Sequence, residues 1–400
     1  MKLISSYSHG ASVDDAIREM ETQIPIDVVP SLVLCYFTEE YSYTELASKL
    51  HQRFPDTPIQ GASSCRGIMT EKGFHTGPVV GLLLICDNVT SAYGCSTVCY
   101  DDFNSIEEAT LNTLNQAIKN SGRVGEQPDL ILLHTTSGSE EAAVACINEE
   151  FCGYVPLMGG TAADNQVTGN WGIFSNHTTT RSGVSISVLY PSQSISTGFQ
   201  AGYSATDISG LVTKVQGREL IEIDNQPALD VYRAWVAEFD NSELVVNGKL
   251  FESTNSFPFG RVSYGDKQQP LYNLAHPVQI GPNGGIETFT SIQLGEVIHL
   301  MTGTRQRLIS RAERVVDAAK SSHLSGLSSI GGLCIFCAGS MIHIEETMNQ
   351  VSQQVHYALD KKPFICPFTY GEQGGFNPRV NSHGNLMISS AVFHASKRNG

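Results

Sequence analysis

The hydrophobic positions in the first half of the chain alternate between helix-like and strand-like patterns. Between Val13 and Ile24 the apolar residues recur every three or four positions, and Ser12 with Asp15 has the spacing of a capping box, which predicts a helix. Short apolar runs are typical of buried strands, and the amphipathic stretches between them predict further helices. The expected strands lie at 31–37, 79–86 and 129–136, and the expected helices at 44–54, 105–117 and 139–151.

The same alternation returns in the second half, after a change of texture near Gln226. A helix is expected from Pro227, because proline favours the first position of a helix, and a loop-rich segment follows at 252–270. Further strands are expected at 295–304, 330–337, 363–370 and 385–393, and further helices at 307–320 and 341–359. These patterns predict an α/β (mixed α+β) protein with two layered domains, 1–225 and 226–400, and mixed sheets flanked by helices.

Composition and charge narrow the classes of function. The chain has 400 residues with 25 Lys and Arg against 40 Asp and Glu, so its net charge is −15. Nucleic-acid binding needs a basic stripe, and adhesion to anionic membranes needs a basic surface, so we expect neither. The longest strongly apolar run, Val79 to Cys86, is far shorter than the roughly 20 residues of a membrane helix. Because the N-terminus turns polar within a few residues, we expect no signal peptide and a cytoplasmic protein.

The ten cysteines are interpreted as reduced structural thiols. Cys334 and Cys337 have the spacing of a redox pair, but they lie in the expected strand 330–337, where residues three apart point to opposite faces. Cys65 stands beside Arg66, whose charge lowers a thiol pKa. A nucleophilic Cys65 would also need a base such as His75 or His134, so a cysteine-dependent enzyme is kept as a less favoured hypothesis.

Two turns in the first half offer candidate ligand contacts. The segment from His134 to Ala142 joins a strand to a helix, and Ser139 is expected either to cap that helix or to contact a ligand. The stretch "MGGTAADN" lets the backbone approach a ligand or a neighbouring strand closely, and it lacks the Lys-Ser/Thr pair of a phosphate-binding loop. Site lining and a tight turn both remain open for its candidate residues, which are Gly159, Gly160, Thr161, Asp164 and Asn165.

The strongest site argument joins two strand ends in the second half. If strands 330–337 and 363–370 run parallel in one sheet, the turns after them share the edge at which α/β proteins bind ligands. The residues at these turns are Gly339, Ser340, Gly371, Glu372 and Gln373. A polar loop then leads to His383, which we expect beside the same pocket as Glu372.

Two histidines are candidates for this edge. His343 is expected in the first turn of the helix 341–359, where the positive end of the helix keeps an imidazole neutral. A neutral His343 or His383 could accept a hydrogen bond or bind a metal, and either could equally be a surface or capping residue. The sequence contains no H-x-x-x-H, no H-E-x-x-H and no paired set of C-x-x-C motifs, so a structural zinc is not expected. Haem, in contrast, needs only one axial histidine and an apolar cleft.

Several stretches together resemble the FIST sensory family, which combines an N-terminal FIST domain with a FIST_C domain. "GGTAADN" and "LVTKVQGRELIEIDNQPALDVY" resemble the first domain, and "CAGSM", "FTYGEQGGF" and "HGNLM" resemble the second. The similarity spans about residues 30–393, and it depends on the order and spacing of the motifs. The resemblance implies a non-catalytic sensory protein of bacterial signal transduction that binds a small ligand and reports to a partner.

One branch of the family, the NosP type, binds haem, senses nitric oxide and regulates a partner histidine kinase or a cyclic-di-GMP enzyme. For this chain the resemblance implies haem with His383 or His343 as the axial ligand, or another small ligand such as an amino acid. Many FIST_C domains carry an arginine about where Ser340 stands, and this departure removes a guanidinium for an anionic ligand at that position.

Overall fold

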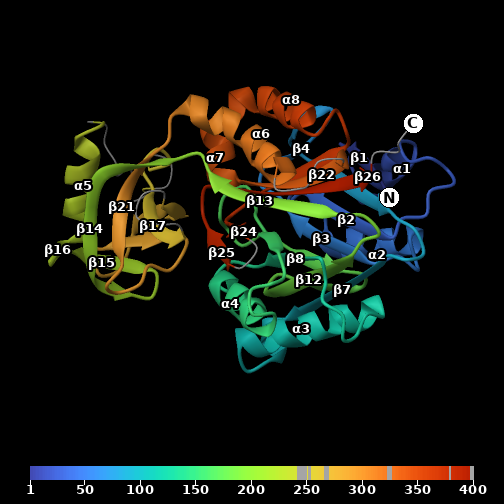
Figure 1. Ribbon diagram of the computed structural model, residues 1–400, viewed down its shortest axis with the longest axis horizontal. Helices are drawn as coiled ribbons and strands as arrows, with labels where there is room; N and C mark the ends of the chain where they lie inside the picture. The colour runs from blue at the N-terminus through green and yellow to red at the C-terminus, as the bar shows by residue number, and fades with distance from the viewer. Residues whose placement is uncertain (241–249, 251–253, 265–269, 322–326, 378–379, 397–400) are drawn as a thin grey trace.

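The computed structural model describes residues 1–240, 250, 254–264, 270–321, 327–377 and 380–396. The strands in this part of the chain form four sheets, three in a large body and one in a smaller lobe, with the lobe on the left of Figure 1. Helices cover the outer faces of the sheets, so the predicted mixed α/β layers are confirmed. Within the described residues, none of the helices is both long and apolar enough to span a bilayer.

The first body sheet mixes parallel and antiparallel pairs. Strand β2 pairs in parallel with β3 and antiparallel with β6. In sheet order the strands are β1 (Lys2–Ser8), β6 (Val80–Cys86), β2 (Leu32–Phe37), β3 (Ile59–Ser63), β10 (Ile173–Ser175) and β11 (Thr178–Thr180). The helices on its outer side are α1 (Val13–Glu21) and α2 (Tyr43–Arg53). The hydroxyl of Ser12 accepts a hydrogen bond from the amide of Asp15 at 3.1 Å, which confirms the predicted cap of α1.

The second body sheet contains the "MGGT" stretch. In sheet order its strands are β25 (Val380–Gly384), β24 (Glu372–Asn377), β9 (Leu157–Thr161), β8 (Leu130–Thr135), β12 (Gly183–Tyr190) and β7 (Ala92–Cys99). Helices α3 (Ile106–Ser121) and α4 (Glu140–Glu150) cover its outer face. Strands β24 and β25 form an antiparallel hairpin where the sequence predicted a polar loop, so that prediction was wrong.

The third body sheet joins distant parts of the chain. In sheet order its strands are β13 (Ile195–Ala201), β26 (Met387–Ser396), β22 (Leu327–Cys337), β23 (Phe364–Thr369), β4 (Gly67–Thr70) and β5 (Gly73–Thr76). Strands β22 and β23 pair in parallel, so the condition on which the shared edge of their turns depends is met. The expected helix 341–359 is broken at Ile344 into α7 (Ala338–His343) and α8 (Met348–Ala358). The helix before β22 is α6 (Arg305–Ser321).

The smaller lobe is a twisted antiparallel sheet with one described helix, α5 (Ala228–Ala237). Its strands in sheet order are β18 (Leu271–Ala275), β17 (Phe259–Tyr264), β21 (Val297–Thr302), β14 (Ser204–Gln216), β15 (Glu219–Ile223), β20 (Ile286–Thr288) and β19 (Pro277–Ile280), with β16 (Gln226–Pro227) beside β15. Pro227 occupies the N-cap of α5, so the predicted helix start is confirmed to within one residue.

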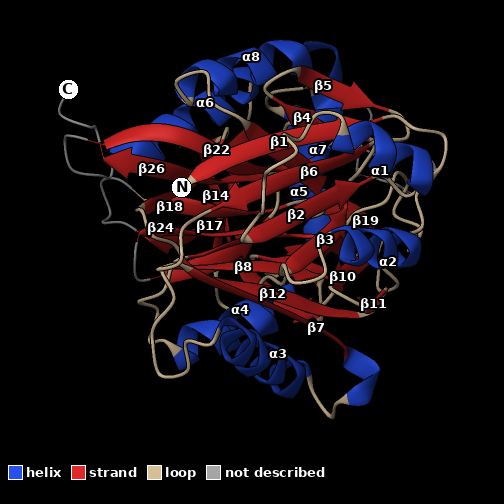
Figure 2. Ribbon diagram, turned by 90° about the vertical axis from the view of Figure 1, so that its right-hand side faces the viewer, coloured by secondary structure: helices blue, strands red, loops and turns tan. Residues whose placement is uncertain are grey.

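The inner faces of the three body sheets meet in one central core. Leu34, Leu132 and Ile335, one from each sheet, are 1% exposed or less and belong to the same apolar cluster. Figure 2 shows the sheets stacked, with helix pairs on three sides of the body. Burying a leucine or isoleucine in such a core stabilises the fold by about 1.5–3 kcal/mol. Met158 of β9 belongs to this cluster, and β9 pairs with β24 of the β24–β25 hairpin, which lies toward the lobe in Figure 1.

Candidate functional site

Five charged or titratable side chains from distant parts of the chain meet where the lobe contacts the body. We call Glu140, Glu141, Arg218, Arg261 and His383 the junction cluster. The two glutamates open α4, Arg218 lies in the turn between β14 and β15, Arg261 lies on β17, and His383 lies on β25. Figure 1 shows β24 and β25 between the lobe and the rest of the body.

Arg218 joins the lobe to both glutamates. Its Nη2 lies 2.8 Å from Glu140 Oε2 and 2.6 Å from Glu141 Oε2, and the amides of Gly138 and Ser291 also donate to these carboxylates. Burial raises the pKa of Glu141, but His383, Arg218 and the Ser291 amide outweigh it and lower the pKa to about 2. Glu141 is therefore ionised at neutral pH.

His383 is buried at 5% exposure, and its ring has a free edge. Its Nδ1 lies 3.3 Å from Nε2 of Gln373, a donor, which assigns the ring proton to Nε2. Nε2 has no hydrogen-bond partner among the described residues, and neither has Oε1 of Gln373. Burial lowers the pKa of His383 more than Glu140 and Glu141 raise it, so the imidazole is neutral at pH 7.

Gly371 makes room for this imidazole. Its φ of +150° is one that L side chains rarely adopt, and a Cβ placed there would lie 2.4 Å from Cε1 of His383. The neighbouring Gln373 Nε2 also donates to Thr161 Oγ1 at 3.3 Å, and Thr161 donates to Glu140 at 3.2 Å. A hydrogen-bonded chain thus links β9, β24 and β25 to the start of α4.

The cluster is electrically balanced. Two carboxylates face two guanidinium groups, and the neutral imidazole adds no charge. The ligand atoms of Glu140, Glu141 and His383 lie within 4.8 Å of one another, a spacing that could hold a metal ion. However, each oxygen of both carboxylates already accepts a hydrogen bond, and a divalent cation would have to displace Arg218. The charges therefore match an uncharged polar or zwitterionic molecule better than a cation.

Arg261 brings the second guanidinium toward the cluster. It is half-buried, its Nη1 donates to the carbonyl of Ser291 at 2.6 Å, and its Nε has no partner among the described residues. Burial lowers the pKa of Arg261, and the neighbouring Glu296 and Glu141 oppose this shift. A guanidinium remains charged at neutral pH and can recognise a carboxylate through two parallel hydrogen bonds.

The predicted residues of β9 divide between packing and the cluster. Thr161 belongs to the hydrogen-bonded chain described above. Gly159 and Gly160 allow close packing, because a Cβ would lie 1.9 Å from the carbonyl oxygen of Leu133 and 2.5 Å from the methyl group of Thr369, respectively. Their small size therefore serves the contact of β9 with its neighbours.

Asp164 and Asn165 organise a turn. The buried carboxylate of Asp164 accepts bonds from four backbone amides between residues 166 and 170 and from the hydroxyl of Tyr370. Burial raises the pKa of Asp164, but the Tyr370 hydroxyl and these amides lower it below its usual range. Asn165 contacts the Arg66 amide and Glu40. These bonds favour the turn interpretation and lie outside the junction cluster.

Glu372 and His383 lie on opposite faces of the β24–β25 hairpin. His383 pairs with Gln373, whereas Glu372 pairs with Gly384 and points the other way. Glu372 is fully buried and accepts hydrogen bonds from Thr369 Oγ1 at 2.8 Å and from an amide of β26 at 3.0 Å. Burial raises its pKa well above the usual range. The expectation that Glu372 and His383 border one pocket is therefore wrong.

Gly339 and Ser340 lie in α7, in a different environment from His383. A Cβ on Gly339 would contact Leu386, Asn255 and His276, and Ser340 is 2% exposed. The hydroxyl of Tyr203 donates to the carbonyl of Asn255 in the same region. These contacts pack α7 against the lobe rather than against the junction cluster.

The described residues around the two candidate histidines do not fit a haem. An axial imidazole needs an apolar cleft for the porphyrin, and His383 is surrounded by charged groups. His343 ends α7 instead of opening a helix, and its carbonyl accepts a bond from Arg305. Burial and then Arg305 lower the pKa of His343, so the imidazole is neutral as predicted, but the predicted cause, a helix N-terminus, is wrong.

The thiol environments oppose a cysteine nucleophile. Cys65 is 1% exposed, and burial raises its pKa to about 12 despite the adjacent Arg66. His134 bonds to the Tyr36 hydroxyl and to a carbonyl, and His75 bonds to a threonine hydroxyl, so neither ring is hydrogen-bonded to Cys65. All ten cysteines are free, and Cys334 and Cys337 lie in β22 as expected.

Ser139 stands at the N-cap of α4 without capping it. Its hydroxyl donates to the Thr136 carbonyl at 2.9 Å and accepts from the Tyr100 hydroxyl at 2.7 Å. The two glutamates that follow it in "SEEAA" were missed as site residues because acidic residues in the first turn are common in any helix. Arg218 and Arg261 carry no local signal, since only the fold brings them to α4.

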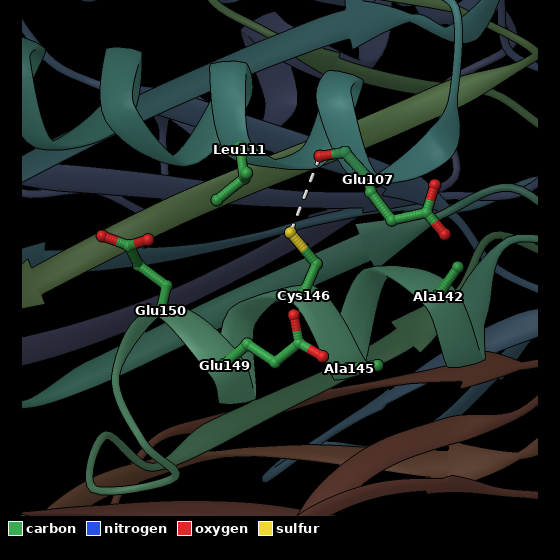
Figure 3. A pocket seen from close by; sticks show the side chains of 7 residues that line it. All are labelled: Glu107, Leu111, Ala142, Ala145, Cys146, Glu149 and Glu150. Atoms are coloured by element: carbon green, nitrogen blue, oxygen red, sulfur yellow. Dashed lines mark hydrogen bonds between the residues drawn. The ribbon is translucent and has the colours of Figure 1, made fainter.

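A groove lies between α3 and α4, apart from the junction cluster (Figure 3). Its volume is ≈ 380 Å³, and its lining residues are Glu107, Leu111, Ala142, Ala145, Cys146, Glu149 and Glu150. None of the residues selected from the sequence lies in this groove, because its apolar floor is short and its acidic residues resemble an ordinary solvated helix face.

Comparisons with known proteins identify two domains that cover most of the chain. The FIST N domain profile matches residues 31–226, and the FIST C domain profile matches residues 228–375. Comparison with curated protein sequences finds no match. Among solved structures, a cyanuric acid hydrolase from A. caulinodans is similar with 11% identity and a TM-score of 0.29, over 76% of this chain and 99% of that one. At this level the likeness carries no argument about function.

Proposed function

The chain belongs to the FIST family, whose domains are small-ligand sensory domains in signalling, and we propose that it senses a small zwitterionic molecule, such as an amino acid, in the junction cluster. One observation carries the proposal. Charges of both signs converge with a buried His383 Nε2 that has no partner among the described residues, at the contact between the lobe and the body. Buried polar groups normally find partners, so an unpartnered one marks a place for a ligand.

The two ends of a zwitterion match the two kinds of charge. An ammonium group can donate to Glu140 and Glu141, and a carboxylate can accept from Arg261 and from the Nε2 proton of His383. The arginine that many FIST_C domains carry about where Ser340 stands is absent here. Arg218 and Arg261 supply guanidinium groups from elsewhere in the fold, which restores the possibility of binding a carboxylate.

Binding at this position also provides a signal. Arg218 belongs to the lobe and its ion-pair partners belong to the body, so a ligand ammonium competes with Arg218 for the same carboxylates. A ligand that binds one arrangement of lobe and body better than another shifts the population toward it. The protein is then a cytoplasmic sensor without catalytic activity, and its output is contact with a partner histidine kinase or cyclic-di-GMP enzyme.

A thermal-shift panel of the twenty common amino acids at 1 mM tests this function. Ligand binding to the native state raises the melting temperature, and a ligand at a hundred times its Kd stabilises by about 2.7 kcal/mol. We expect a shift for one chemical class of amino acid, lost in His383→Ala and Glu141→Gln and retained in the exposed control Asp56→Asn. An unshifted panel, or equal shifts in all variants, contradicts the proposal.

A haem-bound nitric oxide sensor is the second candidate, and only the resemblance to the haem-binding branch of the family favours it, because Nε2 of His383 carries the ring proton. The charged surroundings oppose it. The absorption spectrum of the purified protein after addition of haem decides between the two. A Soret band of a ligated haem that is lost in His383→Ala or His343→Ala would favour the haem sensor, and a spectrum of free haem would reject it.

A further inference from the structure

The groove between α3 and α4 has an apolar floor and an acidic rim. Leu111 from α3 and Ala142, Ala145 and Cys146 from α4 form the floor. In Figure 3 the side chain of Glu107 stands on the α3 side, and those of Glu149 and Glu150 stand at the end of α4. The groove volume of ≈ 380 Å³ suits a few side chains of a partner rather than a whole domain.

The carboxylates of Glu107, Glu149 and Glu150 all act on the thiol of Cys146. Burial, followed by Glu149, Glu107 and Glu150, raises the pKa of the Cys146 thiol to about 11. None of the three glutamates forms an ion pair with a residue in the described part of the chain. The groove therefore carries three carboxylates that are not paired with a cation among the described residues.

The position of two of these acids on α4 is itself unfavourable. The C-terminal end of a helix carries partial negative charge, which favours cations there. The last turn of α4 has no basic residue and instead contains Glu149 and Glu150. A cation that binds at this end would relieve repulsion from both the helix and the side chains.

We propose that this groove is the docking surface for a basic amphipathic helix of the signalling partner. Lysine and arginine place an apolar stem along an apolar surface and keep the charged head at its rim. Leu111 and Ala145 would contact the stems, and Glu107, Glu149 and Glu150 would receive the heads. The charge of the groove selects a basic protein segment and repels nucleic acid.

Helix α4 links this groove to the junction cluster. Its first turn carries Glu140 and Glu141, and its remaining turns carry the groove residues from Ala142 to Glu150. An eleven-residue helix is about 16 Å long and moves as one rigid element. In this respect the inference rests on the proposed function: a ligand that shifts the first turn of α4 also shifts one wall of the groove.

Fluorescence anisotropy with a defined peptide tests the docking surface. The probe is a fluorescein-labelled amphipathic peptide of about 18 residues with a lysine face, and the same peptide with glutamate in place of lysine is the negative control. We compare the wild-type chain with E107Q/E149Q/E150Q and with D27N/D56N/D317N. The second variant removes the same charge from exposed sites outside the groove.

The groove variant should bind the lysine peptide about tenfold more weakly than the wild type, and the control variant should differ less than about twofold. Equal weakening in both variants would overturn the proposal, because it would assign binding to net charge alone. Displacement of the peptide by micromolar spermidine would also overturn it in favour of a small polycation.

The melting temperature of each variant, measured alone, shows whether it is folded. The amino-acid panel on the groove variant separates the two proposals, because its junction cluster is intact. If the groove variant loses peptide binding but keeps the normal thermal shift with the amino acid, the result supports both the docking proposal and the sensor proposal. An absent ligand shift in the wild type defeats the sensor proposal and leaves the docking result standing.

Discussion

The surroundings of Glu372 and those of Glu141 shift the pKa values of two glutamates in opposite directions. Glu372 has neutral hydrogen-bond partners in the core, so burial raises its pKa. Glu141 is close to Arg218 and to a backbone amide, so its pKa falls to about 2 although burial opposes the shift. The first arrangement stabilises a closed core, whereas the second maintains charge at a surface between two parts of the molecule.

This difference teaches how to separate structural from functional acids in this chain. A neutral buried carboxyl group can be replaced by an isosteric amide, because its charge is not used. An ionised one is maintained by partners that a ligand can engage or displace. Four substitutions test this contrast.

Replacing Arg218 by methionine should lower the free energy of unfolding by about 3 kcal/mol, because it leaves the buried Glu140 and the partly buried Glu141 without their guanidinium. Urea denaturation at pH 7 measures the loss. Arg18→Met is the matched control, since Arg18 pairs with Asp15 on the surface and should cost less than about 1 kcal/mol. Equal losses would remove the distinction between the junction and an ordinary surface pair.

Gly371→Ala should lower the free energy of unfolding by about 2–3 kcal/mol. The new methyl group would overlap the imidazole of His383 and would stand on a backbone with φ of +150°. Gly284→Ala is the control, because its φ is also positive but its Cβ position is open, so about 1 kcal/mol is expected. If both substitutions cost the same, Gly371 is not needed to accommodate His383.

Glu141→Gln should reduce the loss of unfolding free energy between pH 7 and pH 3 by about 2 kcal/mol. In the wild type the lowered pKa contributes stability that is complete above the ordinary carboxyl pKa near 4.5 and is lost as the pH falls toward about 2. Urea midpoints at pH 7, 5, 4 and 3 measure this slope. A variant with the same slope as the wild type would show that Glu141 is not held ionised by its neighbours.

Glu372→Gln should change the free energy of unfolding at pH 7 by less than about 1 kcal/mol, or raise it. A raised pKa means that the stability contributed by Glu372 is complete below the ordinary pKa near 4.5 and declines as the pH rises toward the folded-state value. The amide mimics the protonated acid, so this decline should be absent in the variant. A loss of several kcal/mol would instead indicate an ionised, partnered Glu372.

Sequence patterns predicted most of the body but not the hairpin. The apolar runs of β22 and β23 predicted both strands, and the structure adds that the two strands pair in parallel. Strands β24 and β25 are rich in glycine and polar residues, so they lack the apolar alternation that marks a strand. In addition, β24 pairs with β9 over only two residues. The hairpin then decides which side chains share a face, and it separates Glu372 from His383.

The candidate site was predicted only where it coincides with glycine-rich turns. Thr161, Gln373 and His383 were selected from their turns and belong to the hydrogen-bonded chain in the structure. Glu140 and Arg218 were not selected, because their partners lie far away in sequence and a single charge has no local meaning. Long-range charge pairing depends on the arrangement of the lobe and the body, which no short motif encodes.

A crystal structure of the protein grown with the amino acid that gives the largest thermal shift is the most direct test of the junction cluster as a sensor site. We expect the ammonium group within hydrogen-bond distance of Glu140 or Glu141, and the carboxylate on Arg261 and His383 Nε2. A ligand bound elsewhere, or density at the cluster that contacts none of these groups, would contradict it.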